Sequence, residues 1–179
     1  MKTILFSFGT HEQEFTTLAN AALAVANEVN FQVIIQAGYT KIASTKPNIE
    51  VHRIIDHRSF NRLVEQSDVF ISQVSPGNLF TALENGHIPI MWPRRKHFLE
   101  HVDDHQFLFG DYLSSLGLAQ IVMNQEELLR AIEQYRNLDR EAVKKRANKL
   151  LTASKNRTLI FNKNLRGFLD QNFENITDV

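Results

Sequence analysis

Residues 93–106 hold the densest group of side chains that could carry out chemistry. The stretch reads Pro-Arg-Arg-Lys-His-Phe-Leu-Glu-His-Val-Asp-Asp-His-Gln and directly follows an apolar run. Arg94 and Arg95 could bind phosphates or an acidic partner through charge-assisted hydrogen bonds. A solvated polar loop is the alternative interpretation of the same composition. The side chains of Asp103, His105 and Gln106 provide hydrogen-bond acceptors and donors that could bind the hydroxyl groups of a sugar.

Histidines recur at four-residue spacing in the same stretch. His97, His101 and His105 would share one face of a helix, with two carboxylates nearby. Such a face is a possible metal-ligand pattern. The stretch between Pro93 and Asp103 argues against one straight helix through all three histidines. We therefore expect no metal ion and no cofactor.

Two turns elsewhere in the sequence could bind anions through their backbone. Gly9 and Thr10 end an apolar run over residues 2–8, and residues 72–78 (Ser-Gln-Val-Ser-Pro-Gly-Asn) join another such run to a helix. Backbone N–H groups at the start of a helix bind phosphates and other anions. Ordinary turn chemistry, with Thr10 as a helix cap, is the alternative. Two such turns on one edge of a sheet would suit a ligand with two phosphates.

Apolar runs alternate with segments of helical periodicity along most of the chain. Helices are expected at residues 14–29, 59–66, 78–85, 101–115, 124–136 and, at the C-terminus, 140–175. Strands are expected at residues 2–8, 31–36, 49–55, 68–72, 88–92 and 118–122. The alternation predicts an α/β, Rossmann-like fold with a parallel sheet covered on both faces. Since such sheets bind ligands at the carboxyl ends of their strands, the three candidate loops should meet at one edge.

The C-terminal segment is strongly basic. Residues 130–166 contain eleven Lys or Arg but only three Asp or Glu, and apolar residues supply a second face. A helix of this kind could lie on anionic lipid or on a partner protein, or it could pack on its own domain with a solvated basic face. We therefore divide the chain into an α/β domain over residues 1–138 and a helical C-terminal extension over residues 139–179.

Composition and charge exclude several classes of protein. The 179 residues include 20 Lys or Arg and 20 Asp or Glu, and this balance argues against a nucleic-acid binder. The absence of cysteine excludes thiol catalysis, disulfides and a thiolate zinc site. The N-terminal apolar run is too short for a signal peptide, and no stretch is long enough to span a membrane. These features predict a cytoplasmic protein.

Several of these motifs together resemble one bacterial family. They are Gly-Thr-His-Glu-Gln at residues 9–13, Gln-Ala-Gly-Tyr at 36–39, Pro-Gly at 76–77, and the Pro-Arg-Arg-Lys and Glu-His-Val-Asp-Asp-His-Gln parts of residues 93–106. The resemblance is to the catalytic subunit of two-component glycosyltransferases of capsular and exopolysaccharide assembly. That subunit is related to the C-terminal half of the peptidoglycan UDP-GlcNAc transferase and to the cytosolic subunit of the dolichol-pathway UDP-GlcNAc transferase. The similarity extends from residue 1 to about residue 135.

The resemblance implies a fold, an activity and partners. The fold would be the C-terminal, nucleotide-sugar-binding half of a GT-B glycosyltransferase. The activity would be inverting transfer of a hexose from a UDP-sugar to a lipid-linked glycan, without a metal ion. A separate membrane-anchored subunit would bind the acceptor and hold this chain peripherally at the inner face of the plasma membrane.

The resemblance also implies site residues. Inverting transfer needs a general base, and His11 is the candidate because imidazole titrates near neutrality, although the base could equally lie on the partner subunit. The donor sugar would contact Asp103, His105 and Gln106. The donor diphosphate and nucleotide would contact Gly9, Thr10, Ser75, Pro76, Gly77, Asn78 and Thr81.

One loop departs from the family pattern. Relatives usually carry His-Ala-Gly-Pro-Gly-Ser where residues 73–78 read Gln-Val-Ser-Pro-Gly-Asn. Many relatives also carry a glutamate that binds the ribose hydroxyls at the position of Thr81. A threonine makes one such hydrogen bond but not a charge-assisted pair. The alternative function is therefore a noncatalytic or regulatory subunit of the same fold with a degenerate donor site.

Overall fold

The computed structural model describes residues 2–28, 31–44 and 46–173. Arg136, Arg157 and residues 159–173 are described by their backbone alone. Within them a six-stranded parallel sheet forms in the order β3-β2-β1-β4-β5-β6. Its strands are β1 (Lys2–Ser7), β2 (Phe31–Gln36), β3 (Ile49–His52), β4 (Val69–Gln73), β5 (Ile90–Trp92) and β6 (Gln120–Ile121). From β1 the chain adds β2 and β3 on one side of the sheet. It then returns to the centre, where β4 pairs with the other side of β1 and is followed outward by β5 and β6. The loops after β1 and β4 therefore flank the point where such sheets bind ligands.

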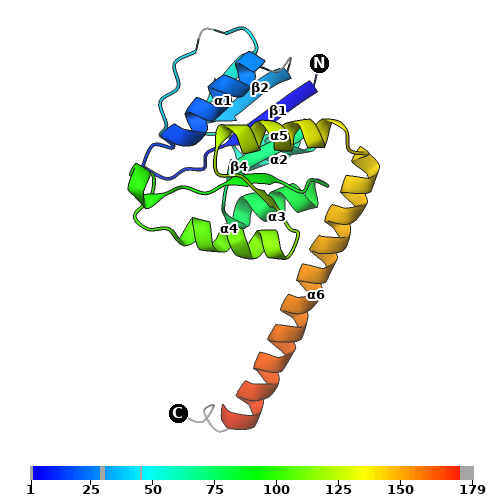
Figure 1. Ribbon diagram of the computed structural model, residues 1–179. Helices are drawn as coiled ribbons and strands as arrows, with labels where there is room; N and C mark the ends of the chain where they lie inside the picture. Colours follow the sequence, from blue (N-terminus) through cyan, green and yellow to red (C-terminus); the bar gives the residue numbers. More distant parts are fainter. Residues whose placement is uncertain (1, 29–30, 45, 174–179) are drawn as a thin grey trace.

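Helices cover both faces of the sheet, which confirms the predicted α/β fold (Figure 1). The α1 and α5 helices pack in one core cluster with Ile4 and Phe6 of β1, while α2 and α3 contribute to clusters on the other face. Because both faces are buried, the central strands are continuous apolar runs rather than alternating ones. The helices are α1 (Thr16–Glu28), α2 (His57–Gln66), α3 (Pro76–Glu84), α4 (His105–Ser115), α5 (Gln125–Arg136) and α6 (Arg140–Phe173).

Some predicted boundaries were wrong. The strand expected over 49–55 ends at His52, and those expected over 88–92 and 118–122 begin at Ile90 and Gln120. The largest difference is in the helix expected over 101–115, which begins only at His105. A 3₁₀ turn, η1 (Lys96–Phe98), and an irregular loop precede it. This difference changes how the chemically richest stretch is presented.

The buried side chain of Glu100 explains the late start of α4. Its Oε1 accepts a hydrogen bond from the backbone N–H of Thr17 in α1 at 2.8 Å, and its Oε2 accepts one from the N–H of Arg95 at 3.4 Å. The preceding Leu99 adopts a left-handed conformation with φ of 59°, which ends η1 and breaks helical continuity. A contact to a distant helix thus overrides the local helical periodicity.

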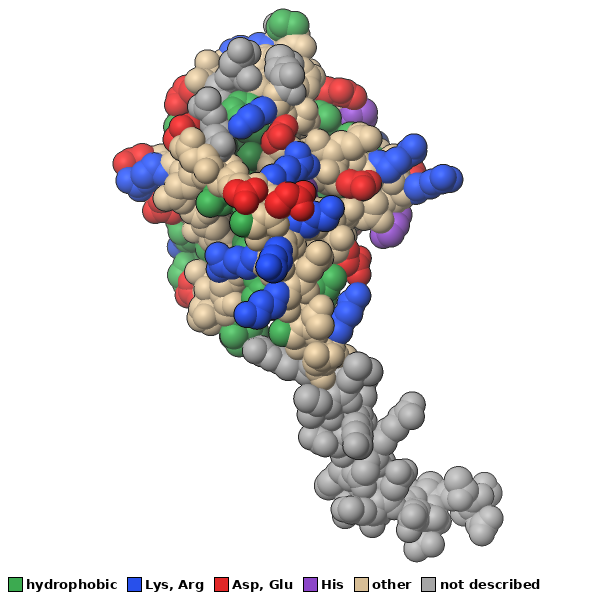
Figure 2. Space-filling model, turned by 90° about the vertical axis from the view of Figure 1, so that its right-hand side faces the viewer, with side chains coloured by type: hydrophobic (Ala, Val, Ile, Leu, Met, Phe, Trp, Pro, Cys, Tyr) green, Lys and Arg blue, Asp and Glu red, His purple; other side chains and the backbone are tan. Residues whose placement is uncertain are grey.

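The first turns of the C-terminal helix α6 pack on the domain. Ala147 is buried in a core cluster, and Leu150 and Leu151 pack against that cluster beside α3 and α4. The rest of α6 extends away from the sheet (Figure 1). Figure 2 shows Lys and Arg side chains gathered over the face where this segment leaves the domain. Among the described residues, no helix is both long enough and apolar enough to cross a membrane.

Candidate functional site

The three candidate loops meet at the carboxyl edge of the sheet, as expected, and one side chain connects them. Arg94, two residues after the end of β5, donates from Nη2 to the carbonyl of Phe8 at 2.9 Å and from Nη1 to the carbonyl of Gln13 at 2.8 Å. It also donates from Nη1 to the carbonyl of Glu100 at 3.0 Å and from Nε to Oε1 of Gln73 at 2.9 Å. These acceptors belong to the β1–α1 loop, the end of β4 and the β5–α4 loop.

The conformation of the β1–α1 loop requires glycine at two positions, Gly9 in the loop itself and Gly38 just after β2. Gly9 has φ of 77°, and a Cβ there would lie 2.0 Å from Nε2 of Gln73. Gln36 at the end of β2 binds both sides of Gly9, accepting from its N–H at 3.2 Å and donating to its carbonyl at 3.0 Å. Gly38 has φ of 61°, and a Cβ there would lie 2.2 Å from the carbonyl oxygen of Gly9. The turn that exposes Thr10 is thus rigidly held.

His11 follows in the same loop and is half-buried. Its Nδ1 accepts a hydrogen bond from the backbone N–H of Gln13 at 3.2 Å. An imidazole nitrogen that accepts carries no proton, so this bond assigns the proton of neutral His11 to Nε2. The accessible face of His11 is then a hydrogen-bond donor.

The β4–α3 turn presents the open start of a helix. Ser75 caps α3 by accepting from the N–H of Asn78 at 3.3 Å, and Pro76 occupies the first turn. Gly77 is exposed, and a Cβ built on it would meet no atom within 4 Å. Nδ2 of Asn78 is buried without a hydrogen-bond partner among the described residues. The half-buried Thr81 lies one helical turn further along α3. An open helix N-terminus of this kind can bind an anion.

The three residues expected to bind a sugar lie at the start of α4. Gln106 is buried, and its Oε1 accepts from the backbone N–H of Arg94 at 3.1 Å. Asp103 and His105 are exposed, and Oδ1 of Asp103 accepts from the N–H of His105 at 3.1 Å and lies 2.5 Å from its Nδ1. These hydrogen bonds, the backbone one first, lower the pKa of the Asp103 carboxyl. Asp103 therefore stays ionised and orients His105.

A cluster of three histidines connects the first and third loops. The ring centroid of His101 lies 4.6 Å from that of His11 and 4.6 Å from that of His105. Burial first, and then the proximity of the His11 and His105 rings, lower the pKa of His101. Sequence reasoning considered His101 only as one third of a metal pattern and missed its contact with His11. Neutral His101 can accept or donate a hydrogen bond beside the two loops.

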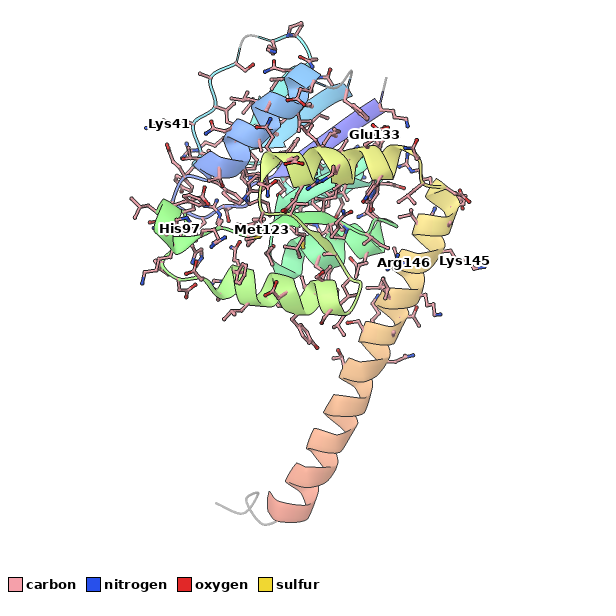
Figure 3. The ribbon with its side chains drawn as sticks, in the orientation of Figure 1. Lys41, His97, Met123, Glu133, Lys145 and Arg146 are labelled. Atoms are coloured by element: carbon pink, nitrogen blue, oxygen red, sulfur yellow. The ribbon has the colours of Figure 1, made fainter. Side chains whose placement is uncertain are left out.

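His97, His101 and His105 do not lie on one helix, as expected from the stretch between Pro93 and Asp103. His97 is exposed in η1 with its ring stacked on Phe98, at the end of the domain away from α6 (Figure 3). His101, Asp103 and His105 do place one potential ligand atom each within 4.8 Å of one another. In the described part of the chain, however, both of these histidines already lie against the Asp103 carboxylate. The geometry is that of a hydrogen-bonded group.

Arg94 requires a correction. We expected its side chain at a phosphate or partner surface, and it is instead 1% exposed, with four protein acceptors around the guanidinium and the ring of Phe15 4.4 Å away. Burial lowers its pKa to about 10, so it keeps its positive charge at neutral pH. Arg95 is half-buried, with its guanidinium 5.2 Å from the ring of Phe107. Of the two arginines, Arg95 is the one that can reach a ligand or a partner.

Sequence reasoning also missed three residues that shape the site, which are Gln36, Gln73 and Glu100. Gln36 and Gln73 are the last residues of β2 and β4, whereas Glu100 lies in the loop before α4. Each of the three side chains binds backbone or Arg94. The signal was present, since a glutamine at the end of an apolar strand is unusual. It did not reveal the partner, because each partner belongs to another loop.

Together, the sheet order, the helices on both faces and the open carboxyl edge define the C-terminal half of a GT-B glycosyltransferase. Residues 3–160 match the profile of the glycosyltransferase family 28 C-terminal domain. The chain belongs to this family. The match reaches beyond the expected limit near residue 135 and includes the part of α6 that packs on the domain.

Solved structures of the same fold are larger than this chain. CalG4, the calicheamicin glycosyltransferase, is 16% identical with a TM-score of 0.62, and the alignment covers 96% of this chain and 43% of CalG4. The glycosyltransferase SnogD from Streptomyces nogalater is 20% identical with a TM-score of 0.59, and the alignment covers 89% of this chain and 43% of SnogD. MurG from Acinetobacter baumannii is 17% identical with a TM-score of 0.55, and the alignment covers 84% of this chain and 45% of MurG. The chain thus spans less than half the length of these proteins. No curated protein matches the sequence significantly.

Proposed function

We propose that this chain binds a UDP-sugar at the carboxyl edge of its sheet and supplies the donor half of an inverting hexosyltransferase. The observation that carries the proposal is the open start of α3 at the point where the strand order reverses. There Gly77 faces open space and the buried Nδ2 of Asn78 has no partner among the described residues. The turn of the half-buried Gly9 and the exposed Thr10 lies at the same edge and offers a second set of backbone groups.

The same geometry suits a departing diphosphate. Negative charge develops on the UDP as the sugar leaves, and the N–H groups and dipole of α3 are already oriented toward it. Such groups stabilise the leaving group without a metal ion. Asp103 and His105, with Gln106 beneath them, would orient the sugar ring through its hydroxyl groups. Arg95 would add a charged contact to the phosphate or to the partner.

The proton assignment of His11 changes its proposed role. The sequence suggested a general base, but Nδ1 already accepts a hydrogen bond and Nε2 carries the proton. We therefore assign His11 to donate from Nε2 to a donor-substrate oxygen, and we place the general base on the acceptor-binding subunit. The longer glutamine side chain can place an amide N–H donor where Nε2 of the histidine lies. The shorter asparagine side chain reaches only the position of Nδ1.

His11→Gln and His11→Asn therefore test this role. Transfer measured with the partner subunit present should stay within about threefold of wild type for His11→Gln and fall at least about tenfold for His11→Asn, with UDP affinity changed little in either. A general base would instead be lost in both variants, and the low-pH limb of the turnover profile would disappear.

The remaining parts of the proposal concern the partner and the acceptor. The chain covers less than half of the GT-B proteins of the same fold, so we propose that a membrane-anchored subunit supplies the acceptor-binding half. The acceptor would be a lipid-linked glycan of capsule or exopolysaccharide synthesis at the inner face of the plasma membrane. The exposed lysines and arginines in the described part of α6, which include Lys145 and Arg146 (Figure 3), suit an anionic surface.

A noncatalytic subunit of the same fold is the second candidate. The observation that favours it is the identity of two residues in the donor loop. Gln73 uses its side chain to hold Arg94, and Thr81 has no carboxylate to bind a ribose. In that case the fold would be retained for assembly with the partner.

Calorimetry with UDP, with and without EDTA, separates the two candidates. The chain is titrated alone and after co-purification with the partner subunit. Binding that survives EDTA supports a metal-independent donor site, and UDP-sugars with the partner then test transfer. No binding by either the chain or the complex would contradict the proposal and favour the noncatalytic subunit.

A further inference from the structure

Arg94 is an unusually costly residue to bury. Its guanidinium is enclosed between the β1–α1 loop, β4 and the β5–α4 loop, and four N–H bonds go to three backbone carbonyls and one side-chain oxygen. Burying a charge in this way carries a large desolvation cost, and a well-packed apolar side chain in the same place is often as stable or more so. Stability alone therefore gives a weak reason for an arginine here. Geometric specificity is the better one.

The partners of Arg94 lie next to the groups proposed to bind the donor. The Phe8 carbonyl precedes Gly9, and the Gln73 side chain lies two residues before the cap of α3. On the third loop, the backbone N–H of Arg94 holds Gln106. A planar guanidinium has five N–H donors in a fixed arrangement, and four are used here. It therefore fixes the relative positions of three loops at once.

Gln73, the last residue of β4, completes this arrangement. Its Oε1 accepts from Nε of Arg94, while its Nε2 occupies the space that a Cβ on Gly9 would need. The side chain thus lies between the phosphate-binding turn at Gly9 and the buried guanidinium. A lysine at position 94 has one ammonium group and cannot reach all four acceptors with the same geometry.

We infer that Arg94 and Gln73 are a pair of positioning residues that set the spacing between the two diphosphate-binding turns and the sugar-binding loop. The inference rests on the proposed function for its ligand, but the positions of the loops can be measured without any ligand. Arg94 acts through Phe8, Gln13, Glu100 and Gln106 and does not itself touch the donor.

The test uses the full chain with Arg94→Lys, Gln73→Met and both changes together. Arg130→Lys is the matched control, since it makes the same substitution on the exposed surface of α5. Amide hydrogen exchange is followed in residues 9–17 and 94–106, with β2 as an internal reference. UDP affinity is measured on the same samples by calorimetry.

Arg94→Lys should speed exchange in both loops while β2 stays protected, and should weaken UDP binding at least about tenfold, since small displacements of binding groups have effects of this size. Gln73→Met should do the same to a smaller extent, and the double variant should be no worse than Arg94→Lys because the two residues act through one contact. Arg130→Lys should change neither quantity.

Two results would overturn the inference. One is an unchanged UDP affinity in Arg94→Lys when the wild type binds UDP. The other is exchange that rises equally in β2 and in the loops, which would make Arg94 a general stabiliser. If the wild type binds UDP neither alone nor with the partner subunit, but the two loops alone lose protection in Arg94→Lys, the proposed function fails and the positioning role stands.

Discussion

The substitution Gly77→Ala separates ligand binding from folding. Gly77 lies in the first turn of α3 with ordinary helical φ, and an added Cβ would meet no protein atom within 4 Å. Alanine is favoured over glycine in helices by about 0.5–1 kcal/mol, and less at the first turn, so the variant should be stabilised by about 0.5 kcal/mol. For a chain of this size, this corresponds to a rise in Tm of about 1–2 °C.

The added methyl group should nevertheless reduce donor binding. It would occupy the open space in front of the α3 amides, where the proposal places the diphosphate. We expect UDP affinity to fall about tenfold, which is about 1.4 kcal/mol. Calorimetry and thermal unfolding on the same sample measure the two effects, which have opposite signs.

Gly110→Ala is the control for this prediction. Gly110 is also helical, and its Cβ would make ordinary contacts of 3.5–3.6 Å with the side chain of Ile121 in β6 instead of facing open space. It should stabilise the protein in the same way and leave UDP binding unchanged. The reasoning is refuted if Gly77→Ala binds UDP as tightly as the wild type does.

Three further predictions follow from buried contacts. Gly38→Ala should destabilise the fold by at least about 2 kcal/mol and weaken UDP binding, because its Cβ would lie 2.2 Å from the Gly9 carbonyl oxygen and φ is 61°; denaturation and calorimetry would show both effects. Tyr135→Phe should lower the free energy of unfolding, measured by urea denaturation, by about 2 kcal/mol. The buried Tyr135 hydroxyl donates a hydrogen bond to the carbonyl of Ile88 and accepts one from its N–H, and burial raises the pKa of Tyr135 to about 12. Burial and then the charge of Arg140 lower the pKa of His87 below 6.5. The unfolded state therefore binds more protons than the folded state does, and the free energy of unfolding rises with pH through that region. His87→Gln should flatten this rise when unfolding is measured between about pH 5 and 7.

Much of the secondary structure follows from local sequence. The strand at residues 31–36 begins and ends where its apolar run does, and α1 buries the positions predicted by its spacing, such as Leu18, Ala22 and Val25. Ser75, Asp56 and Asn124 cap their helices by accepting a hydrogen bond from the third residue along. These features depend on neighbours within a turn or two, so sequence is enough to predict them.

The site was predicted less completely, because its contacts span the chain. The three loops were placed at one edge correctly, since the carboxyl ends of parallel strands share an edge. The roles of Arg94 and Glu100 were not predictable, because their partners Phe8 and Thr17 lie more than eighty residues away in sequence. A run of arginines, a lysine and a histidine has the composition of an exposed loop whether or not one member is buried.

The sequence by itself determined the α/β alternation, the glycine turns and the set of polar residues near the sheet edge. It did so because strand and helix periodicity, left-handed turns and chain direction are local or nearly local properties. Which of those polar residues are buried and which stay exposed at the edge depends on the tertiary structure. Burial of Arg94 and Glu100 depends on carbonyl and N–H groups of distant loops, and such groups have a position only once the sheet has formed.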